Sequence, residues 1–235
     1  DIILATKVGG ATNSHGLDVS RKHILKSVDE SLQRLGTDYI DLYYTHFDDN
    51  VTPVEETLEA YDDIIKAGKV RFIAASNVSP ARLKESFDIS ENKGLHKYAA
   101  LQPHYNLLER DHFENDYAPL VEQYNLSVFP YWSLAAGFLT GKYRTEDDFS
   151  KSPRGNDVRK YLNEKGLAVL GALDKVAEKH QTQQATVALA WLLAHPLVTA
   201  PIVSATSDRQ LQTIIDAPKL ILDSEDIILL NNVSK

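Results

Sequence analysis

Apolar and polar positions in residues 39–45 follow the two-residue alternation of a β-strand. The stretch is also rich in β-branched and aromatic side chains, and both features predict a strand. The residues that follow carry the signals of a helix start: Thr52 as N-cap, Pro53 at the first helical position and Glu55 three residues after the cap. His46 is therefore predicted to lie at the carboxyl end of a strand, just before the loop to a helix.

The same strand-then-helix pattern recurs along the whole chain. Strands are predicted at residues 2–8, 39–45, 70–77, 98–102, 126–132 and 198–203. Helices are predicted after Ser20, Thr52, Ser79 and Arg110 and at residues 167–179, 182–194, 208–215 and 224–232, with a long irregular segment at 133–163. Strands that are apolar on both faces, in repeated βα units, indicate an α/β protein with a parallel sheet covered by helices. Six such units are too few to close the usual eight-stranded barrel.

Composition narrows the classes of function. The 235 residues are 43% hydrophobic, which is enough for one large core and favours a single domain over residues 1–235. The net charge of -8, with no basic stripe, argues against a nucleic-acid partner. The absence of cysteine excludes disulfides, thiolate nucleophiles and cysteine-bound zinc. No apolar run approaches the ~20 residues that span a bilayer, and no signal-peptide pattern opens the chain, so we expect a cytoplasmic protein without a membrane partner.

Every predicted strand contributes a polar residue at or near its carboxyl end. These residues are Lys7, His46, Ser76, Asn77, Gln102, Tyr131 and Ser204. Each has a plainer explanation alone, since a lysine at a strand end is usually a surface residue and an isolated histidine is usually structural or solvated. Together they favour a site, because the carboxyl ends of parallel strands meet at one edge of a sheet, where α/β proteins bind ligands.

The chemistry of these residue types suits a carbonyl substrate and a nicotinamide cofactor. Lys7 could lower the pKa of a neighbouring phenol or attack a carbonyl as a Schiff-base nucleophile. Asn77 and Gln102 suit a carboxamide, which offers one donor and one acceptor group, and Tyr131 offers a face for a planar ring. The eight histidines show no metal-binding spacing, and no G-x-S-x-G sequence of a serine hydrolase is present.

Five segments in order resemble the motifs of aldo-keto reductases and together span nearly the whole chain. They are LATKVG at 4–9, SLQRLGTDYIDLYYTH at 31–46, GKVRFIAASN at 68–77, LQPHYNL at 101–107 and GFLTGK at 137–142. The resemblance implies a TIM (β/α)8 barrel that binds NADPH at its C-terminal mouth without a G-x-G-x-x-G sequence. It also implies an oxidoreductase that reduces aldehydes and ketones by direct hydride transfer.

The resemblance assigns roles to individual residues. Lys7 resembles the lysine that tunes the acid tyrosine of the family, and His46 resembles the histidine that orients the substrate carbonyl and stabilises its developing charge. Ser76, Asn77 and Gln102 resemble the ligands of the nicotinamide carboxamide. Tyr131 resembles the aromatic residue that lies under the nicotinamide ring.

The remaining assignments concern the phosphate groups of NADPH. The loop that crosses the pyrophosphate corresponds to Leu134, Gly137, Leu139 and Lys142, and Arg154 is a candidate for a further phosphate contact. Ser204, Ala205, Thr206 and Gln210 fall where the last strand meets a helix N-terminus, a suitable place for the 2′-phosphate. For Arg154 and Gln210 a plain surface role is equally open.

The departures from the family pattern limit the prediction. Where the family usually has Tyr-Ser-Pro-Leu, this chain has Tyr-Trp-Ser-Leu at 131–134. Where the family has an asparagine near the adenine, this chain has Ile214. The family's catalytic aspartate and acid tyrosine belong to two βα units that would precede Lys7. We therefore expect an N-terminally incomplete barrel of about six βα units plus a C-terminal helix, with inefficient turnover. Tyr44 lies about 6.6 Å deeper than His46 on the same strand face and is better explained as a core residue than as the acid.

Two alternatives stay open. One is a non-catalytic NADPH-binding regulatory barrel, which cofactor binding without turnover would favour. The other is a Schiff-base aldolase that uses Lys7, which borohydride trapping of a carbonyl substrate would favour. The sequence predicts a small-molecule carbonyl substrate but does not identify it, and it gives no prediction of the oligomeric state.

Overall fold

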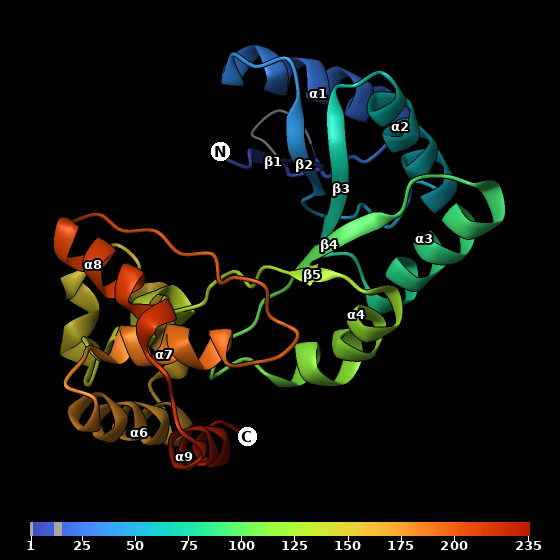
Figure 1. Ribbon diagram of the computed structural model, residues 1–235. Coiled ribbons are helices and arrows are strands. Elements are labelled where there is room, and N and C mark those ends of the chain that lie inside the picture. The colour runs from blue at the N-terminus through green and yellow to red at the C-terminus, as the bar shows by residue number, and fades with distance from the viewer. Residues whose placement is uncertain (1, 12–15) are drawn as a thin grey trace. The chain divides into compact units, whose positions relative to one another are not determined.

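The computed structural model describes residues 2–11 and 16–235, whose helices and strands are drawn in Figure 1. They form two compact units. The first, which we call the sheet unit, consists of the described residues of Asp1–Gln102 and of Leu120–Ser127. The second, the helical unit, consists of Pro103–Pro119 and Val128–Lys235. Among the described residues, no helix has the length and apolar character needed to cross a membrane.

The sheet unit contains the βα repeats that the sequence predicts. In chain order its elements are β1 (Ala5–Val8), α1 (Arg21–Leu35), β2 (Ile40–Thr45), α2 (Val54–Lys66), β3 (Val70–Ser76), α3 (Pro80–Lys93) and β4 (Tyr98–Gln102). Each strand is parallel to the next one in the chain, and α1, α2 and α3 lie in sequence along one face of the sheet (Figure 1). The α/β class with a parallel sheet is therefore confirmed.

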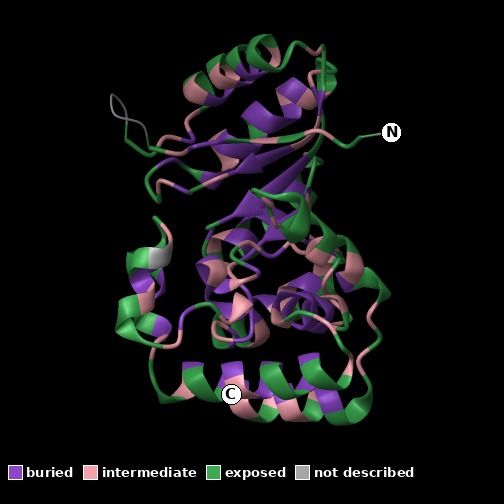
Figure 2. Cartoon of the chain, turned by 90° about the vertical axis from the view of Figure 1, so that its left-hand side faces the viewer, coloured by how far each residue is buried: buried purple, intermediate pink, exposed green. Residues whose placement is uncertain are grey.

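The two faces of this sheet differ in burial. On the face toward the helices, Thr45 shares hydrogen bonds with the hydroxyls of Tyr61 (2.6 Å) and Tyr98 (2.9 Å), so three buried polar groups satisfy one another. On the opposite face Lys7 is exposed and Phe72 keeps 58% of its surface exposed, although Tyr44 and Ala74 at the centre of that face are buried. Figure 2 shows the buried residues gathered in the strands and on the inner sides of the helices.

Local sequence signals explain most helix boundaries in the sheet unit. Ser20 caps α1 by accepting a hydrogen bond from the His23 backbone, and α1 ends at Gly36, which has a φ of 65°. The predicted cap at Thr52 is wrong. The Thr52 hydroxyl instead donates to the Asp49 carboxylate (2.6 Å), and α2 begins one residue after Pro53 with no side-chain cap.

The helical unit is mostly helix and irregular backbone. A π-helix, η1 (His112–Tyr117), leads into α4 (Ala118–Tyr124), and α4 and the short strand β5 (Ser127–Val128) both span the division between the units. The later elements are η2 (Ala135–Thr140), η3 (Glu146–Lys151), α5 (Gly155–Val158), η4 (Arg159–Tyr161), α6 (Glu164–Lys179), α7 (Gln184–Leu193), α8 (Asp208–Asp216), η5 (Ala217–Lys219) and α9 (Ser224–Ser234). α7 is buried along nearly its whole length and packs against α6 and α8.

Three strand predictions differ clearly from the structure. The strand predicted at 2–8 covers only Ala5–Val8. Of residues 126–132 only Ser127–Val128 is strand, followed by a single bridge between Tyr131 and His104. Residues 198–203 do not form a strand, although Val198 bridges to Val128 and the Ile202 backbone donates to Pro130. Prolines at 130 and 201 lack the N–H that a regular ladder needs, so the described sheet has five strands instead of six.

Candidate active site

Lys7 and His46 lie at the carboxyl ends of adjacent strands. Lys7 is near the end of β1 and His46 directly follows β2, where its backbone N–H donates to the Val8 carbonyl (2.7 Å). Both residues line one hollow of the sheet unit together with Gly9 and Phe47. Gly9 has a φ of +91°, and a Cβ there would lie 2.7 Å from the Phe47 carbonyl oxygen, so the turn after β1 needs glycine.

The electrostatics of this pair favour a neutral imidazole. Burial lowers the pKa of His46, and the nearby charge of Lys7 lowers it further. Burial also lowers the pKa of Lys7. The His46 ring packs against Phe47 with a centroid distance of 4.4 Å, which restricts its orientation. A neutral, oriented imidazole can donate a hydrogen bond to a carbonyl oxygen.

Ser76, Asn77 and Gln102 extend the same edge across β3 and β4. The Ser76 hydroxyl donates to the Gln102 carbonyl (3.0 Å), and the Asn77 amide donates to the His46 carbonyl (2.8 Å) and to Ser76 Oγ (3.1 Å). Asn77 has a φ of 49°, in the left-handed region that asparagine tolerates better than most residues. Five of the predicted site residues therefore lie at one edge of the sheet unit.

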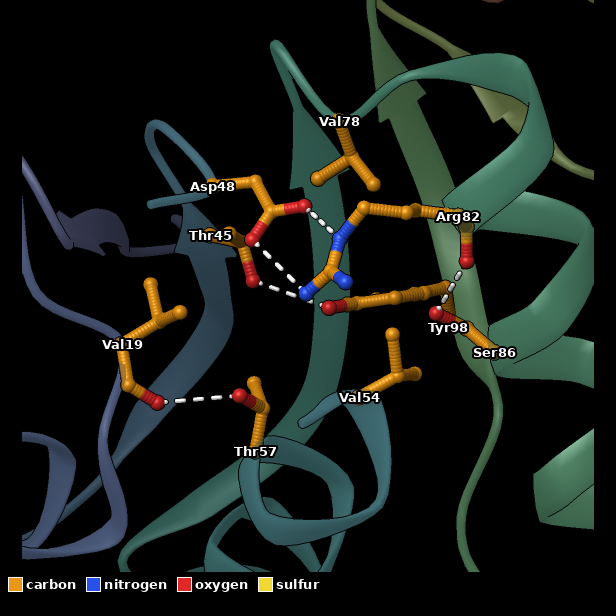
Figure 3. Close-up of a pocket in the computed structure, with 9 residues that line it drawn as sticks. All are labelled: Val19, Thr45, Asp48, Val54, Thr57, Val78, Arg82, Ser86 and Tyr98. Atoms are coloured by element: carbon orange, nitrogen blue, oxygen red, sulfur yellow. Dashed lines mark hydrogen bonds and ion pairs between the residues drawn. The ribbon is translucent and has the colours of Figure 1, made fainter. Parts of the chain in front are cut away.

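The loop after β2 is held by an ion pair between Asp48 and Arg82, which the sequence did not predict. The Arg82 guanidinium of α3 binds both carboxylate oxygens of Asp48 and donates to the Thr52 carbonyl (2.8 Å), as Figure 3 shows for the pair. The Asp48 backbone in turn donates to the Asn77 carbonyl (3.4 Å). The cavity beside Arg82 has a volume of about 10 Å³, which suits one water molecule and excludes a substrate.

In the helical unit, Tyr131 belongs to an aromatic cluster. Its ring stacks on the His104 imidazole with a centroid distance of 5.1 Å and an interplanar angle of 16°, and the Trp132 ring meets the edge of His104 at 84°. The Tyr131 backbone donates to the Pro103 carbonyl (2.9 Å), which fixes the residue. Burial raises the pKa of Tyr131, so its phenol stays neutral.

The segment after Tyr131 is a strained loop. Trp132, Ala135 and Ala136 have φ values of 53°, 48° and 54°, a conformation that costs roughly 1–3 kcal/mol each for residues other than glycine. Hydrogen bonds hold the loop in this shape: the Ser133 hydroxyl donates to the carbonyls of Pro130 and Ile202, both at 3.0 Å. Strain of this kind, when the surroundings maintain it, marks candidate binding loops.

The predicted phosphate ligands of the loop lie within this turn. The backbone N–H groups of Gly137 and Leu139 both donate to the Leu134 carbonyl (2.8 and 3.2 Å). The Leu139 side chain is fully buried and its N–H is bonded to Leu134, whereas the Lys142 side chain is exposed. Arg154 is also exposed and directly precedes the short helix α5.

The other predicted phosphate ligands precede or begin α8. Ser204 and Thr206 are exposed and Ala205 is partly exposed. The Gln210 side-chain oxygen accepts hydrogen bonds from the Thr206 backbone (2.8 Å) and hydroxyl (3.1 Å), so this side chain orders the loop. The N-cap of α8 is Ser207, which the sequence analysis did not single out although a serine before a helix is the usual signal. Within the described residues, no group of three His, Cys, Asp or Glu side chains could hold a metal ion.

Comparison with known proteins gives a consistent family. A profile of the Aldo/keto reductase family matches residues 1–235. The chain is 32% identical over 229 residues to "L-glyceraldehyde 3-phosphate reductase" of Escherichia coli O157:H7, covering 92% of this chain and 65% of that protein. It is 32% identical over 219 residues to "Probable voltage-gated potassium channel subunit beta" of Oryza sativa subsp. japonica, covering 90% and 66%. It is 31% identical over 222 residues to "Versiconal hemiacetal acetate reductase" of Aspergillus parasiticus, covering 93% and 63%. The chain thus spans about two thirds of the length of these relatives.

Proposed function

Because this chain belongs to the aldo/keto reductase family, an oxidoreductase family of the TIM-barrel α/β class, we propose that it reduces small-molecule aldehydes or ketones with NADPH. The observation that carries the proposal is the shared edge of Lys7, His46, Ser76, Asn77 and Gln102 at the ends of four adjacent parallel strands. This edge combines a cation, an imidazole, a hydroxyl and two amides, which suit a carbonyl substrate and a carboxamide-bearing ring.

The residues present fit an NADPH molecule. In the sheet unit, the amides of Asn77 and Gln102 would bind the carboxamide. In the helical unit, Tyr131, whose ring is supported on one face by His104, would offer its other face to a planar ring. The exposed Lys142 of the loop at 134–142 and the N-terminal end of α8 would bind phosphate groups, since cationic side chains and helix N-termini favour anions. Bound there, the nicotinamide would supply the hydride.

The chain's own residues would prepare the carbonyl for reduction. The neutral His46 imidazole would donate a hydrogen bond to the carbonyl oxygen, and the Lys7 ammonium would stabilise the negative charge that develops on it. Tyr44 is poorly suited to deliver the proton, because its side chain is buried and burial raises its pKa to about 12. We therefore propose that NADPH binds well and that turnover by these residues alone is slow.

Two measurements on the same protein test the proposal. NADPH binding is followed by quenching of protein fluorescence, and turnover by NADPH oxidation with an aldehyde such as methylglyoxal. Binding with slow oxidation is expected, and replacing His46 by Gln should lower the remaining rate without weakening NADPH binding. Failure to bind NADPH would refute the cofactor assignment, and rapid turnover would refute the proposed slow rate.

The relatives named as channel subunits support a second candidate, a regulatory NADPH-binding protein. The same measurements separate it from a reductase. A regulatory protein of this kind would bind NADPH but would not oxidise it when an aldehyde or a ketone is added. An aldolase using Lys7 has weaker support in the lowered pKa of that amine. Borohydride trapping of a carbonyl compound on Lys7, absent in a Lys7→Met variant, would be required to sustain it.

A further inference from the structure

A turn at Gly141 connects the strained loop after Tyr131 to Lys142, a predicted phosphate ligand. Gly141 ends η2 with a φ of 78°, and its backbone N–H donates to the Phe138 carbonyl (3.0 Å). The Gln184 side chain, at the start of α7, packs directly against this turn, because a Cβ at Gly141 would overlap the Gln184 amide. The direction in which the chain leads into Lys142 is therefore set at Gly141.

Arg144 holds the same turn through a backbone carbonyl. The Arg144 Nε donates to the Gly141 carbonyl (3.0 Å), and its Nη2 donates to Asp174 Oδ1 on α6 (2.8 Å). The Gln184 amide donates to the same Asp174 oxygen. One carboxylate oxygen thus joins the two side chains that contact Gly141, and it ties the turn to both α6 and α7.

The Lys142 side chain lies close to the backbone of this loop. A Cβ at Gly137 would lie 3.6 Å from the Lys142 Nζ, so the lysine folds back toward the glycine. The Lys142 Nζ also lies 4.9 Å from the centroid of the Tyr143 ring, which is fully buried. The ammonium group is thus held near the loop while the residue remains exposed to solvent, an arrangement that suits an anionic ligand.

Stability alone gives a weak explanation of the contacts of Asp174. The side chains of Arg144 and Asp174 are 37% and 46% exposed, and ion pairs with this much solvent contribute little to folding. A carboxylate in this place also opposes the binding of an anion by Lys142, because like charges repel. What Asp174 supplies is a fixed geometry. A loop that is already ordered loses less conformational freedom when a ligand binds.

We propose that Asp174 is a positioning residue for the phosphate-binding loop. Through Arg144 and Gln184 it orders the Gly141 turn, and it thereby presents Lys142 to a phosphate group of the cofactor. This inference rests on the proposed function, because it assumes that Lys142 binds a phosphate group of NADPH. Asp174 does not contact the ligand and acts only through the two side chains that it holds.

Asp174→Ala tests this role by the sign of its effect on NADPH affinity. A carboxylate that acted only through its charge would repel the phosphates, so its removal would tighten binding. Loss of the ordered turn should instead weaken binding about three- to tenfold, measured by quenching of protein fluorescence at low salt. Asp174→Asn keeps an oxygen acceptor for Arg144 and Gln184 and should retain most of the affinity. The matched control is Glu178→Ala, which removes the same charge one turn further along α6 and should not weaken binding.

A second variant separates this inference from the proposed function. Lys142→Met should weaken NADPH binding, and adding Asp174→Ala should weaken it no further, because both changes act on one contact. The loss in Asp174→Ala should also shrink at high salt, where the attraction between Lys142 and phosphate is screened. Unchanged or tighter binding in Asp174→Ala, or additive losses in the double variant, would overturn the role of Asp174 and leave the proposed function intact. Full NADPH affinity in Lys142→Met would overturn both the role of Asp174 and the phosphate contact proposed for Lys142.

Discussion

The sheet unit and the helical unit hold their candidate site residues in different ways. In the sheet unit the residues stand at the ends of regular strands and are joined by side-chain hydrogen bonds, as Asn77 joins the ends of β2 and β3 through His46 and Ser76. In the helical unit they lie on irregular backbone. Beside Tyr131 and Leu134, the residues Trp132, Ala135 and Ala136 have positive φ, and Ser133 holds this loop through two carbonyls. The sheet edge thus depends mainly on side-chain hydrogen bonds between strand ends, with positive φ confined to Gly9 and Asn77, whereas the loop contains three strained residues close together in the chain.

The largest effect that tests this difference is expected at Arg82. Replacing it by Ala removes the partner of Asp48, whose side chain is only 5% exposed, so an unpaired charge stays buried. We expect a loss of about 3 kcal/mol in the free energy of unfolding, measured by denaturant titration. NADPH affinity should also fall, because the Asp48 backbone is hydrogen-bonded to Asn77, which in turn donates to the His46 carbonyl.

A control for Arg82 lies in the helical unit. Arg110, only 9% exposed on its side chain, binds Glu114 and joins η1 to the end of α9 through Asn231 and Ser234. Arg110→Ala should cost about 2 kcal/mol in unfolding free energy, since Glu114 is partly solvated, and the folded protein should bind NADPH normally. Equal loss of NADPH affinity in both variants would contradict the assignment of Arg82 to the site.

A smaller effect comes from the same substitution placed in the two kinds of backbone. Ala75→Gly in the buried strand β3 should lower the free energy of unfolding by about 1–2 kcal/mol, because it removes a buried methyl and adds backbone entropy to the unfolded chain. Ala136→Gly should instead leave stability unchanged or raise it by about 0.5 kcal/mol, since glycine relieves the strain at φ 54°. Thermal unfolding of both variants measures the difference, and equal destabilisation would show that the loop is not strained.

The same contrast explains which features the sequence could predict. His46, Asn77 and Gln102 were placed correctly at strand ends because alternation and helix signals reflect regular backbone. The strand predicted at 126–132 ends at Val128, because Pro130 lacks the N–H that a regular ladder needs, an effect that the alternation of residues does not reveal. The Asp48–Arg82 ion pair joins residues 34 positions apart, and a single sequence contains no signal for such a contact.

The smallest predicted effect concerns the charge that Lys7 places beside His46. Lys7→Met keeps an unbranched chain of similar length but removes the positive charge that disfavours the imidazolium, so the pKa of His46 should rise. Burial is the larger cause of the shift and remains, so the pKa should stay below its ordinary value of 6.5. Ring proton shifts of His46 in an NMR titration measure both values, with Lys26→Met, which lines the same hollow, as the control.

The titration also fixes the direction of the pH effect on stability. Because the folded pKa of His46 is lowered, the unfolded chain takes up a proton first as the pH falls below about 6.5. His46 therefore reduces stability as the solution is acidified through this window, and Lys7→Met should make that reduction smaller. An unchanged His46 midpoint in Lys7→Met would show that the two side chains do not interact, and the sheet edge would then lack the electrostatic coupling that distinguishes it from the loop.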